Sequence, residues 1–585
     1  MTVASQSDVL LQFGPYALDV QSGELRKGGV RLHLRGKPIQ ILRMLLQCAG
    51  AVVTREEMIA SLWNSTTFVE FEQNLNVNVR RLRDALCEVA DQPRWIETVP
   101  GAGYRFIGSV TRTEATNRAR TTKSGRVAIL VLPIENQTGN EQSNYLAAGL
   151  TEELARELSQ VAPGQMRVVG RESARSATHG TVKSLASAVH AQHIVAGVLD
   201  TSLDGMCLDL YLSGAGNTRC EWSNSFNVDS EDARNMLRAS ALEIANCLRL
   251  EVAPQNVRIG APGTISAVRH SYLRGRYSWH RRSSQDLWRA IAYYKHAVSL
   301  DSDYGPAWAG LAQAYNVLAH RCCAPPREVG PLAGRAANRA IALVPELAEA
   351  CAALGWHRFA YCWKPKEAET AFHAGLAADP EDPILQHAFG MYLLCAGRLH
   401  DAIAHFRVSL ELDPFFPGAN SALTWAYMCA RLYGDAIDHG EQVRSHEPKY
   451  PANLGWLAVT HALMGNVEAS IECGLAVAEY SMRDPLMLCT LAYAYARAGM
   501  RKSALAVIAE VTAPEASYIP SGMVARAWAG LGEAEKCVSW LQRGYDERSE
   551  WVLWAGLDPM MDNMAADDKF GGFVARLWPS RRAGI

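Results

Sequence analysis

A cluster of arginine, asparagine and glutamine residues between Phe71 and Leu86 is the part of this 585-residue chain best suited to recognising a ligand. Asparagine and glutamine amides can form two hydrogen bonds with adenine, arginine can do so with guanine, and a valine can meet the thymine methyl group. Such side chains read base edges in the major groove of DNA. The candidate contacts are Gln73, Asn74, Asn76, Val77, Arg80, Arg81, Arg83 and Arg105.

Apolar spacing predicts that residues 71–86 form a helix. At 100° per residue, one narrow stripe suits a core, and it holds Leu75, Val79, Leu82 and Leu86. The polar candidates lie on the opposite face or flank it. Arg81 and Arg83 could instead contact phosphates, which position a protein without specifying a sequence. For this helix alone, an ordinary solvated, arginine-rich face is an equally good interpretation.

The neighbouring segments predict a small α+β domain over residues 9–109. Strand-like segments cover 10–18 and 25–34, and helical spacing follows in 38–48. Thr54 and Glu57 form a capping box that opens another helix. Two strands joined by a Pro-Gly-Ala-Gly turn complete the domain, and the second strand carries Arg105.

Five motifs in this domain resemble the OmpR/PhoB-type winged helix-turn-helix. They are Phe13-Gly-Pro-Tyr-x-Leu-Asp19, Gly50-x-Val-Val-Thr-Arg-Glu-Glu57, Leu62-Trp63, Asn76-Val-x-Val-Arg-Arg-Leu-Arg-x-x-Leu86 and Ile96-Glu-Thr-Val-Pro-Gly-x-Gly-Tyr-Arg-Phe106. The resemblance implies that 71–86 is the recognition helix and that 99–103 is the tip of a wing near the minor groove.

The same resemblance implies an RNA polymerase contact in the segment before the recognition helix, at Asn64, Ser65, Thr66 and Thr67. Asn76 and Asn78 stand where the family often has Asp and His, so the target sequence does not carry over. Because the winged helix begins near the first residue, we expect no phosphorylated receiver domain before it and no phospho-relay control.

Composition places the chain among globular proteins, with 49% hydrophobic and 20% charged residues. The formal net charge is −2, so a DNA-binding surface must be local. No signal pattern and no run of 18 apolar residues is present, which predicts a cytoplasmic protein. The 14 cysteines lack metal-site spacing and suggest buried thiols, with a redox sensor at Cys322 and Cys323 as the alternative.

Residues 110–125 lack apolar periodicity and are predicted to be a linker. A small α/β domain is expected over 126–250, because a continuous apolar strand at 127–134 opens a β-α-β-α-β-β-β pattern. Segments 127–139 and 145–154 resemble TolB-N-terminal-like domains. This resemblance implies a structural or sensing module, and the missing P-loop motif argues against phosphate binding.

From residue 265 to 550 the chain repeats with a period of 34 residues, at Pro380, Pro414 and Pro448. Small and aromatic residues recur at matching positions, which is typical of tetratricopeptide repeats (TPR). We expect about eight helix pairs in an all-α superhelix with a concave face for partners, and a capping tail over 551–585. The tryptophans are expected at packing positions, with a ligand-binding role as the alternative.

The order of these three regions resembles the soluble HilA-type regulators. It implies a sequence-specific transcriptional regulator, an activator, whose repeats bind a protein or sense a signal. The expected partners are double-stranded promoter DNA, RNA polymerase, and a protein or small-molecule effector at the TPR or TolB-like region. A homo-oligomer is also allowed, and we expect neither a cofactor, nor a metal, nor a membrane.

Two other classes of function compete with this hypothesis. A TPR scaffold could use the winged helix only secondarily, but the outward Arg80, Arg81 and Arg83 argue against it. TolB-like and TPR segments also follow nucleotide cyclase domains in other proteins. Because the chain has no cyclase-like segment and no HExxH, GxSxG or P-loop motif, we expect that it is not an enzyme.

Overall fold

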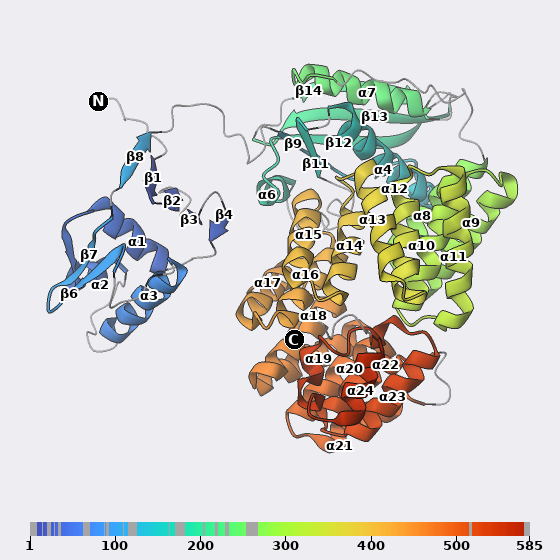
Figure 1. Ribbon diagram of the computed structural model, residues 1–585. Coiled ribbons are helices and arrows are strands. Elements are labelled where there is room, and N and C mark those ends of the chain that lie inside the picture. The colour runs from blue at the N-terminus through green and yellow to red at the C-terminus, as the bar shows by residue number, and fades with distance from the viewer. Residues whose placement is uncertain are drawn as a thin grey trace. The chain divides into compact units, whose positions relative to one another are not determined.

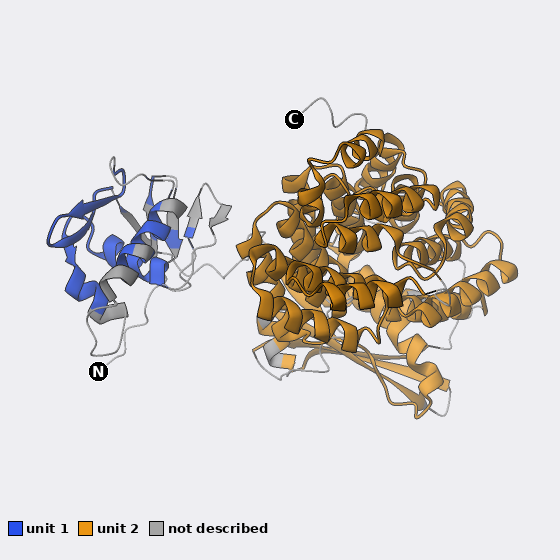
Figure 2. Ribbon diagram, turned by 90° about the horizontal axis from the view of Figure 1, so that it is seen from below, with its two compact units in different colours: residues 1–121 blue, residues 122–585 orange. Residues whose placement is uncertain are grey.

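The computed structural model divides the chain into two units, residues 1–121 and 122–585 (Figure 2). The structure describes residues 9–14, 16–19, 25–27, 30–32, 37–62, 71–86, 88, 93–108, 110–114, 126–162, 164–169, 182–202, 205–216, 220–228, 233–252, 267–513 and 518–577. Each unit has a hydrophobic core of its own. Among the described residues, no helix is both long enough and apolar enough to span a membrane.

In its described part, the first unit contains two antiparallel sheets and three helices (Figure 1). The larger sheet has the order β4-β3-β2-β1-β8 and the smaller one β5-β7-β6. The strands are β1 Val9–Phe13, β2 Tyr16–Asp19, β3 Leu25–Lys27, β4 Val30–Leu32, β5 Val52–Thr54, β6 Ile96–Val99, β7 Gly103–Phe106 and β8 Thr111–Glu114. The helices are α1 Lys37–Gln47, α2 Arg55–Leu62 and α3 Phe71–Ala85.

Strand β8 differs from the linker predicted for residues 110–125. It pairs antiparallel with β1, from Val9 opposite Glu114 to Gln12 opposite Thr111. An edge strand can join a sheet through backbone hydrogen bonds alone, without alternating apolar side chains. The sequence therefore carried no pattern that would predict this strand. The linker prediction is therefore wrong for these four residues, and residues 115–125 lie outside the described part of the chain.

The second unit begins with a sheet of mixed strand direction, in the order β11-β9-β12-β13-β14. Its strands are β9 Val127–Val131, β10 Glu135–Asn136, β11 Met166–Val169, β12 His193–Ser202, β13 Gly205–Gly214 and β14 Cys220–Asn227. Its helices are α4 Asn144–Val161, α6 Val182–Ala188 and α7 Ala233–Cys247. Ile129 and Val131 pack on the side of α4 and α7, whereas Leu130 packs on the side of α6. The predicted order of elements agrees with the described ones except for the short strand β10, which pairs with β12 where a loop was expected.

Helix pairs make up the rest of the second unit (Figure 1). The first helices of the pairs, here called A helices, are α8 Ala267–Arg281, α10 Gly305–His320, α12 Ala348–Trp356, α14 Pro383–Cys395, α16 Pro417–Cys429, α18 Pro451–Met464, α20 Pro485–Arg497 and α22 Ser521–Gly530. The second helices are α9 Ser284–Leu300, α11 Pro326–Leu343, α13 Pro365–Ala378, α15 Leu399–Leu412, α17 Tyr433–His446, α19 Val467–Tyr480, α21 Arg501–Val511 and α23 Ala534–Asp546. The described residues end with η4 Glu550–Val552, η5 Pro559–Met564 and α24 Asp568–Leu577.

The 34-residue period appears directly in the helix starts. Four successive A helices begin at Pro383, Pro417, Pro451 and Pro485. Proline suits the first turn of a helix because the N–H that it lacks would have no partner there. Small residues let the paired helices approach: a Cβ on Gly390 would lie 2.7 Å from the Phe406 ring. The eight pairs in the described residues agree with the expected number.

The sheet domain packs directly on the first helix pair. Leu273 of α8 joins the core beneath α4, and a Cβ on Gly149 of α4 would lie 2.7 Å from its Cδ2. Tyr145 Oη lies 2.7 Å from His270 Nδ1, and Arg269 pairs with Glu153. The middle region and the helix pairs therefore form one body.

Candidate DNA-binding surface

Helix α3 turns one face to the core and another to solvent. Leu75, Val79 and Leu82 are buried, as the sequence predicts. Arg80 and Arg81 are exposed, and neither forms an ion pair within the part of the chain that the structure describes. These two guanidinium groups are therefore available to phosphates or base edges.

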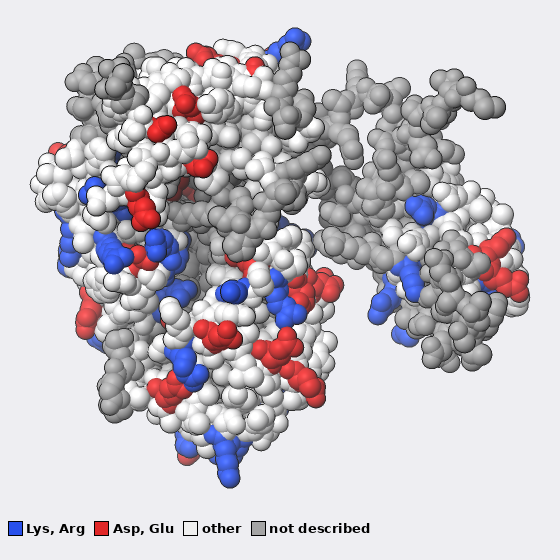
Figure 3. Space-filling model, turned by 180° about the vertical axis from the view of Figure 1, so that it is seen from behind, with Lys and Arg blue, Asp and Glu red and all other residues white. Residues whose placement is uncertain are grey.

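Charge is distributed differently on the two units. In the view of Figure 3, Lys/Arg and Asp/Glu side chains are intermixed over the larger unit. On the first unit in the same view, the visible Asp and Glu atoms form one patch, and most visible Lys and Arg atoms lie away from it (Figure 3). This separation agrees with a local basic surface on a chain whose net charge is −2.

Asn76 occupies a junction between three elements. Its Oδ1 accepts hydrogen bonds from Arg55 Nη1 at 3.0 Å and from Tyr104 Oη at 2.8 Å. The Arg55 guanidinium also lies 5.2 Å from the centre of the Tyr104 ring. Because its carbonyl is occupied, Asn76 cannot make the two-point pairing with adenine in this arrangement. It ties α2, α3 and β7 together instead.

Arg83 points toward the β6–β7 hairpin rather than directly to solvent. Its Nη2 donates to the Ile96 carbonyl and to Thr98 Oγ1, each at 2.8 Å. The side chain is half-buried. Arg83 therefore fastens the helix to the hairpin, which is a positioning role that differs from the expected phosphate or base contact.

The β6–β7 hairpin has the geometry expected of a wing. Gly101 in its turn has φ +74°, a left-handed conformation that glycine adopts without strain. Arg105 on β7 lies opposite Glu97 on β6, and their Nε and Oε2 atoms are 3.6 Å apart. Glu97 thus offsets part of the positive charge that Arg105 brings to this surface.

The Thr54–Glu57 capping box and the Glu88 side chain both stabilise this surface, but only the capping box could be predicted from the sequence. Thr54 and Glu57 form the predicted capping box: Thr54 N donates to Glu57 Oε2 at 2.8 Å, and Glu57 N donates to Thr54 Oγ1 at 3.2 Å. The backbone N–H and the hydroxyl of Thr54, which both donate to the Glu57 carboxylate, lower the pKa of that carboxyl. Sequence reasoning missed Glu88. It is buried, and its Oε1 accepts from the backbone N–H groups of Arg94, Trp95 and Ile96 at 2.7–3.0 Å. A single Glu after a helix carries no local pattern that would reveal this role.

Several candidate residues lie outside what the structure describes. Helix α3 includes Gln73, Asn74 and Val77, but their side chains are not among those described. The segment from Asn64 to Thr67 is also outside the described residues. Base contacts by Gln73, Asn74 and Val77 remain predictions. The RNA polymerase contact by residues 64–67 also remains a prediction.

Comparison with known proteins bears on this same region. Residues 29–106 match the family described as "Transcriptional regulatory protein, C terminal". The chain is 31% identical over 105 residues to the sensory transduction protein RegX3 of Mycolicibacterium smegmatis, covering 18% of this chain and 46% of that protein. It is 36% identical over 87 residues to the response regulator protein GraR of Staphylococcus haemolyticus, covering 15% of this chain and 38% of that protein.

Residues 29–106 form an OmpR/PhoB-type DNA-binding domain. The chain spans less than half the length of the curated relatives that it matches. Among solved structures, the TPR protein YrrB shares 22% sequence identity, with coverage of 32% of this chain and 90% of that one and a TM-score of 0.22. The helical region of the present chain is identified by its own helix pairs and their period.

The described residues offer no metal site, and their buried cysteines do not favour redox chemistry. No group of three or more His, Cys, Asp or Glu side chains there could hold a metal ion. Cys351, Cys395, Cys429 and Cys489 are buried thiols, as predicted, whereas the same expectation is wrong for Cys48, Cys220 and Cys247, which are exposed. Burial raises the pKa of the neighbouring Cys322 and Cys323 thiols, which disfavours the reactive thiolate that a redox sensor needs.

Proposed function

We propose that this protein is a sequence-specific transcriptional regulator that binds promoter DNA through α3 and activates transcription through contact with RNA polymerase in the cytoplasm. One observation carries the proposal. In a domain of the OmpR/PhoB type, α3 buries its leucine stripe and leaves Arg80 and Arg81 exposed. A helix held in this way can enter the major groove with its cationic side chains toward the DNA.

We further propose that the second unit supplies regulation. Its sheet region fits a TolB-like module, its helix pairs fit a TPR array, and the order of regions fits a HilA-type regulator. A stacked array of helix pairs offers a concave surface for a protein or small-molecule effector, and such an array can also mediate self-association. Helix α4 of the sheet region packs directly on α8 of the helix pairs. Effector binding to the helix pairs could therefore change the position of the sheet region.

The test is promoter occupancy of the full-length protein, measured by pull-down and sequencing of bound chromosomal DNA. The variant Arg80→Ala with Arg81→Ala should lose the sequence motif shared by the wild-type peaks. The matched control is Arg43→Ala with Arg94→Ala, which removes the same charge from exposed positions outside α3. We expect the control to retain the motif.

Equal loss of the motif in both double variants would mean that charge alone drives binding. Occupancy that stays unchanged in the α3 variant would exclude α3 as the reading helix. The second candidate function, a TPR scaffold, is favoured by the eight helix pairs that dominate the described chain. It predicts no shared motif under any peak, together with stable protein partners.

A further inference from the structure

The A helices of successive helix pairs line a partly open cavity of about 390 Å³. Its wall repeats with the period of the chain, because equivalent positions on successive A helices line it, at Ile384, Gly418, Ala452 and Leu486, and at Ala388, Ala422, Trp456 and Thr490. Helices α10 and α12 contribute the same face, including Asn316 and Trp356. The volume lies in the range of small-molecule sites, roughly 300–1,000 Å³.

The C-terminal segment contributes to the wall of this cavity. Trp551 of η4 lines the cavity, and its Nε1 donates to the His320 carbonyl at 2.9 Å. Its ring packs 5.7 Å from that of Trp425, which in turn stacks on Trp456 at 4.6 Å. Glu550 pairs with the His320 ring. A volume of about 390 Å³, with Trp551 of the C-terminal segment in its wall, suits a compact ligand better than an extended peptide.

The wall offers positive charge and hydrogen-bond donors. Arg281, Arg282 and Arg321 line the cavity, and no Asp or Glu does so among the described residues. Arg321 Nε is buried and has no hydrogen-bond partner in the described part of the chain. Burial, with Arg282 and His320 nearby, lowers the pKa of His387 to about 3, so this histidine is neutral and the arginines supply the charge.

Aromatic side chains supply both a flat apolar surface and further donors. The indole N–H groups of Trp279, Trp356 and Trp425 are buried without a hydrogen-bond partner among the described residues. All three side chains line the cavity. Buried donors are normally paired, and here the unpaired groups need acceptors. A ligand that brings anionic oxygens on an aromatic body would satisfy both features.

We propose that this cavity binds a small organic anion with an aromatic or apolar body, such as an aromatic carboxylate, between Arg321 and the tryptophan rings. Only the role of this ligand as an effector rests on the proposed regulatory function. Binding itself requires no DNA.

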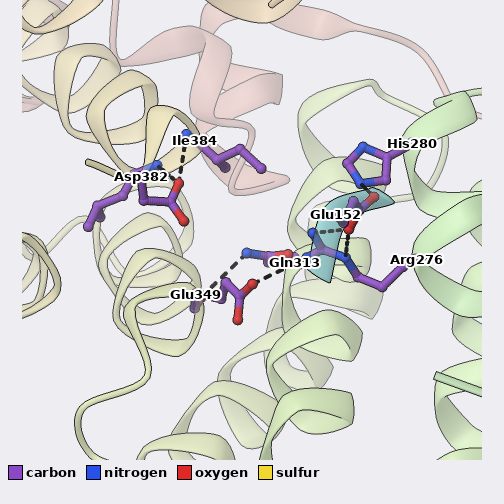
Figure 4. Close-up of polar contacts among 8 residues, drawn as sticks. Glu152, Arg276, His280, Gln313, Glu349, Asp382 and Ile384 are labelled. Carbon is purple, nitrogen blue, oxygen red and sulfur yellow. Dashed lines mark hydrogen bonds and ion pairs between the residues drawn. The ribbon is translucent and has the colours of Figure 1, made fainter. Parts of the chain in front are cut away.

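A connection to the sheet domain starts at the wall of the cavity (Figure 4). His280 lines the cavity, and its Nε2 lies 2.7 Å from Glu152 Oε1 on α4. Arg276 Nη2 donates to the same carboxylate at 2.8 Å, and its Nη1 lies 3.5 Å from Glu349 (Figure 4). A ligand that shifts α8 would therefore alter the ion pairs that hold the sheet domain.

The test titrates the full-length protein with two dyes of the same skeleton and follows their fluorescence. These are 8-anilinonaphthalene-1-sulfonate, which is anionic, and N-phenyl-1-naphthylamine, which is uncharged. We expect saturable binding of the sulfonate at one site and weaker binding of the amine. Arg321→Gln should weaken the sulfonate about tenfold or more and leave the amine unchanged, because a charge-assisted hydrogen bond is lost. Arg289→Gln, a half-exposed arginine paired with Asp286 outside the lining, is the control and should change neither.

A second variant keeps the test decisive if Arg321→Gln melts at a lower temperature than the wild type. Trp356→Phe removes one indole N–H and keeps an aromatic ring, so sulfonate affinity should fall several-fold with little change for the amine. Equal affinity for both dyes, or sulfonate binding unaffected by both variants, would overturn the proposal. Saturable binding of neither dye would also overturn it and leave the cavity to a protein partner. Repeating a DNA titration with the sulfonate present tests the effector role separately, so a silent DNA-binding domain would not mask cavity binding.

Discussion

The arginines of α3 have different roles because only one of them faces another element of the domain. Arg80 and Arg81 face solvent, whereas Arg83 meets the backbone of β6 and is held there by two hydrogen bonds. Helical periodicity identifies the face on which a residue lies. It does not identify the strand that will cover the edge of that face, so the different role of Arg83 was not predictable.

Arg83→Met should separate positioning from DNA contact. It keeps the apolar stem but removes both hydrogen bonds, so the free energy of unfolding of the domain should fall by about 1–3 kcal/mol. Because Arg83 does not reach a phosphate in this arrangement, the slope of log affinity against log salt should stay that of the wild type. Arg80→Ala, if Arg80 contacts a phosphate, should reduce that slope by about 1. A reduced slope for Arg83→Met in DNA titrations would show that the side chain leaves the wing when DNA binds.

At the scale of elements, a left-handed residue recurs after each A helix. It is found at Arg282, Cys322, Trp363, Gly397, Arg431, Gly465, Gly499 and Gly532, and the five from Trp363 to Gly499 are spaced by 34 residues. Glycine adopts this conformation at little cost, whereas other residues pay roughly 1 kcal/mol. At Arg431 the side chain contacts the chain end through Asp562, at 2.6 Å, and this ion pair offsets part of that cost.

Two glycine substitutions should therefore have opposite effects. Gly465 has φ +80°, Gly434 lies in the first turn of α17 without a positive φ, and a Cβ at either would meet no atom within 4 Å. Gly465→Ala should lower the free energy of unfolding by about 1 kcal/mol, and Gly434→Ala should raise it by about 0.5 kcal/mol. Urea denaturation of the two variants measures both. Equal effects would show that backbone conformation does not determine the cost.

Sequence reasoning was most successful where a pattern repeats. The leucine stripe of α3, the capping box at Thr54 and the 34-residue period each rest on several residues at fixed spacing, and the structure confirms them. The pairing of β8 with β1 joins segments about 100 residues apart, and Glu88 accepts hydrogen bonds from a backbone segment six to eight residues further on. Such contacts leave no local pattern, so they become visible only in the folded chain.

At the scale of the whole second unit, the sheet domain and the helix pairs share a partly buried ion cluster. Glu152 on α4 contacts Arg276 and His280 on α8 (Figure 4). Burial alone would raise the pKa of the Glu152 carboxyl, but Arg276 and His280 hold it well below its ordinary value. A depressed pKa in the folded state adds stability above the unfolded pKa of about 4.3, and that stability is lost as pH falls through the folded pKa.

Glu152→Gln should consequently destabilise the second unit by about 3 kcal/mol near pH 7, because it leaves Arg276 without its closest carboxylate. The difference from the wild type should narrow as the pH falls below about 4.3. Urea denaturation at a series of pH values is the measurement. Glu441→Gln, which breaks an exposed pair with Arg444, should cost at most about 1 kcal/mol. A difference that widens in acid would contradict the stabilising role of the Glu152 carboxylate.

The contact between the second helix pair and the chain end changes how this array should lose its structure. His320 meets Glu550 and Trp551, and Arg327 donates to the carbonyl of Asp546. Repeat proteins ordinarily behave as linear stacks, in which each unit senses only its neighbours and the terminal units fray first. In this array, the C-terminal residues contact the second helix pair, and these contacts should suppress fraying of the terminal helices. The amide hydrogens of the terminal and central helices should therefore exchange with solvent at similar rates. The same contacts join residues more than 200 positions apart in the sequence. The second helix pair can therefore form all of its contacts only after the C-terminal helices have folded.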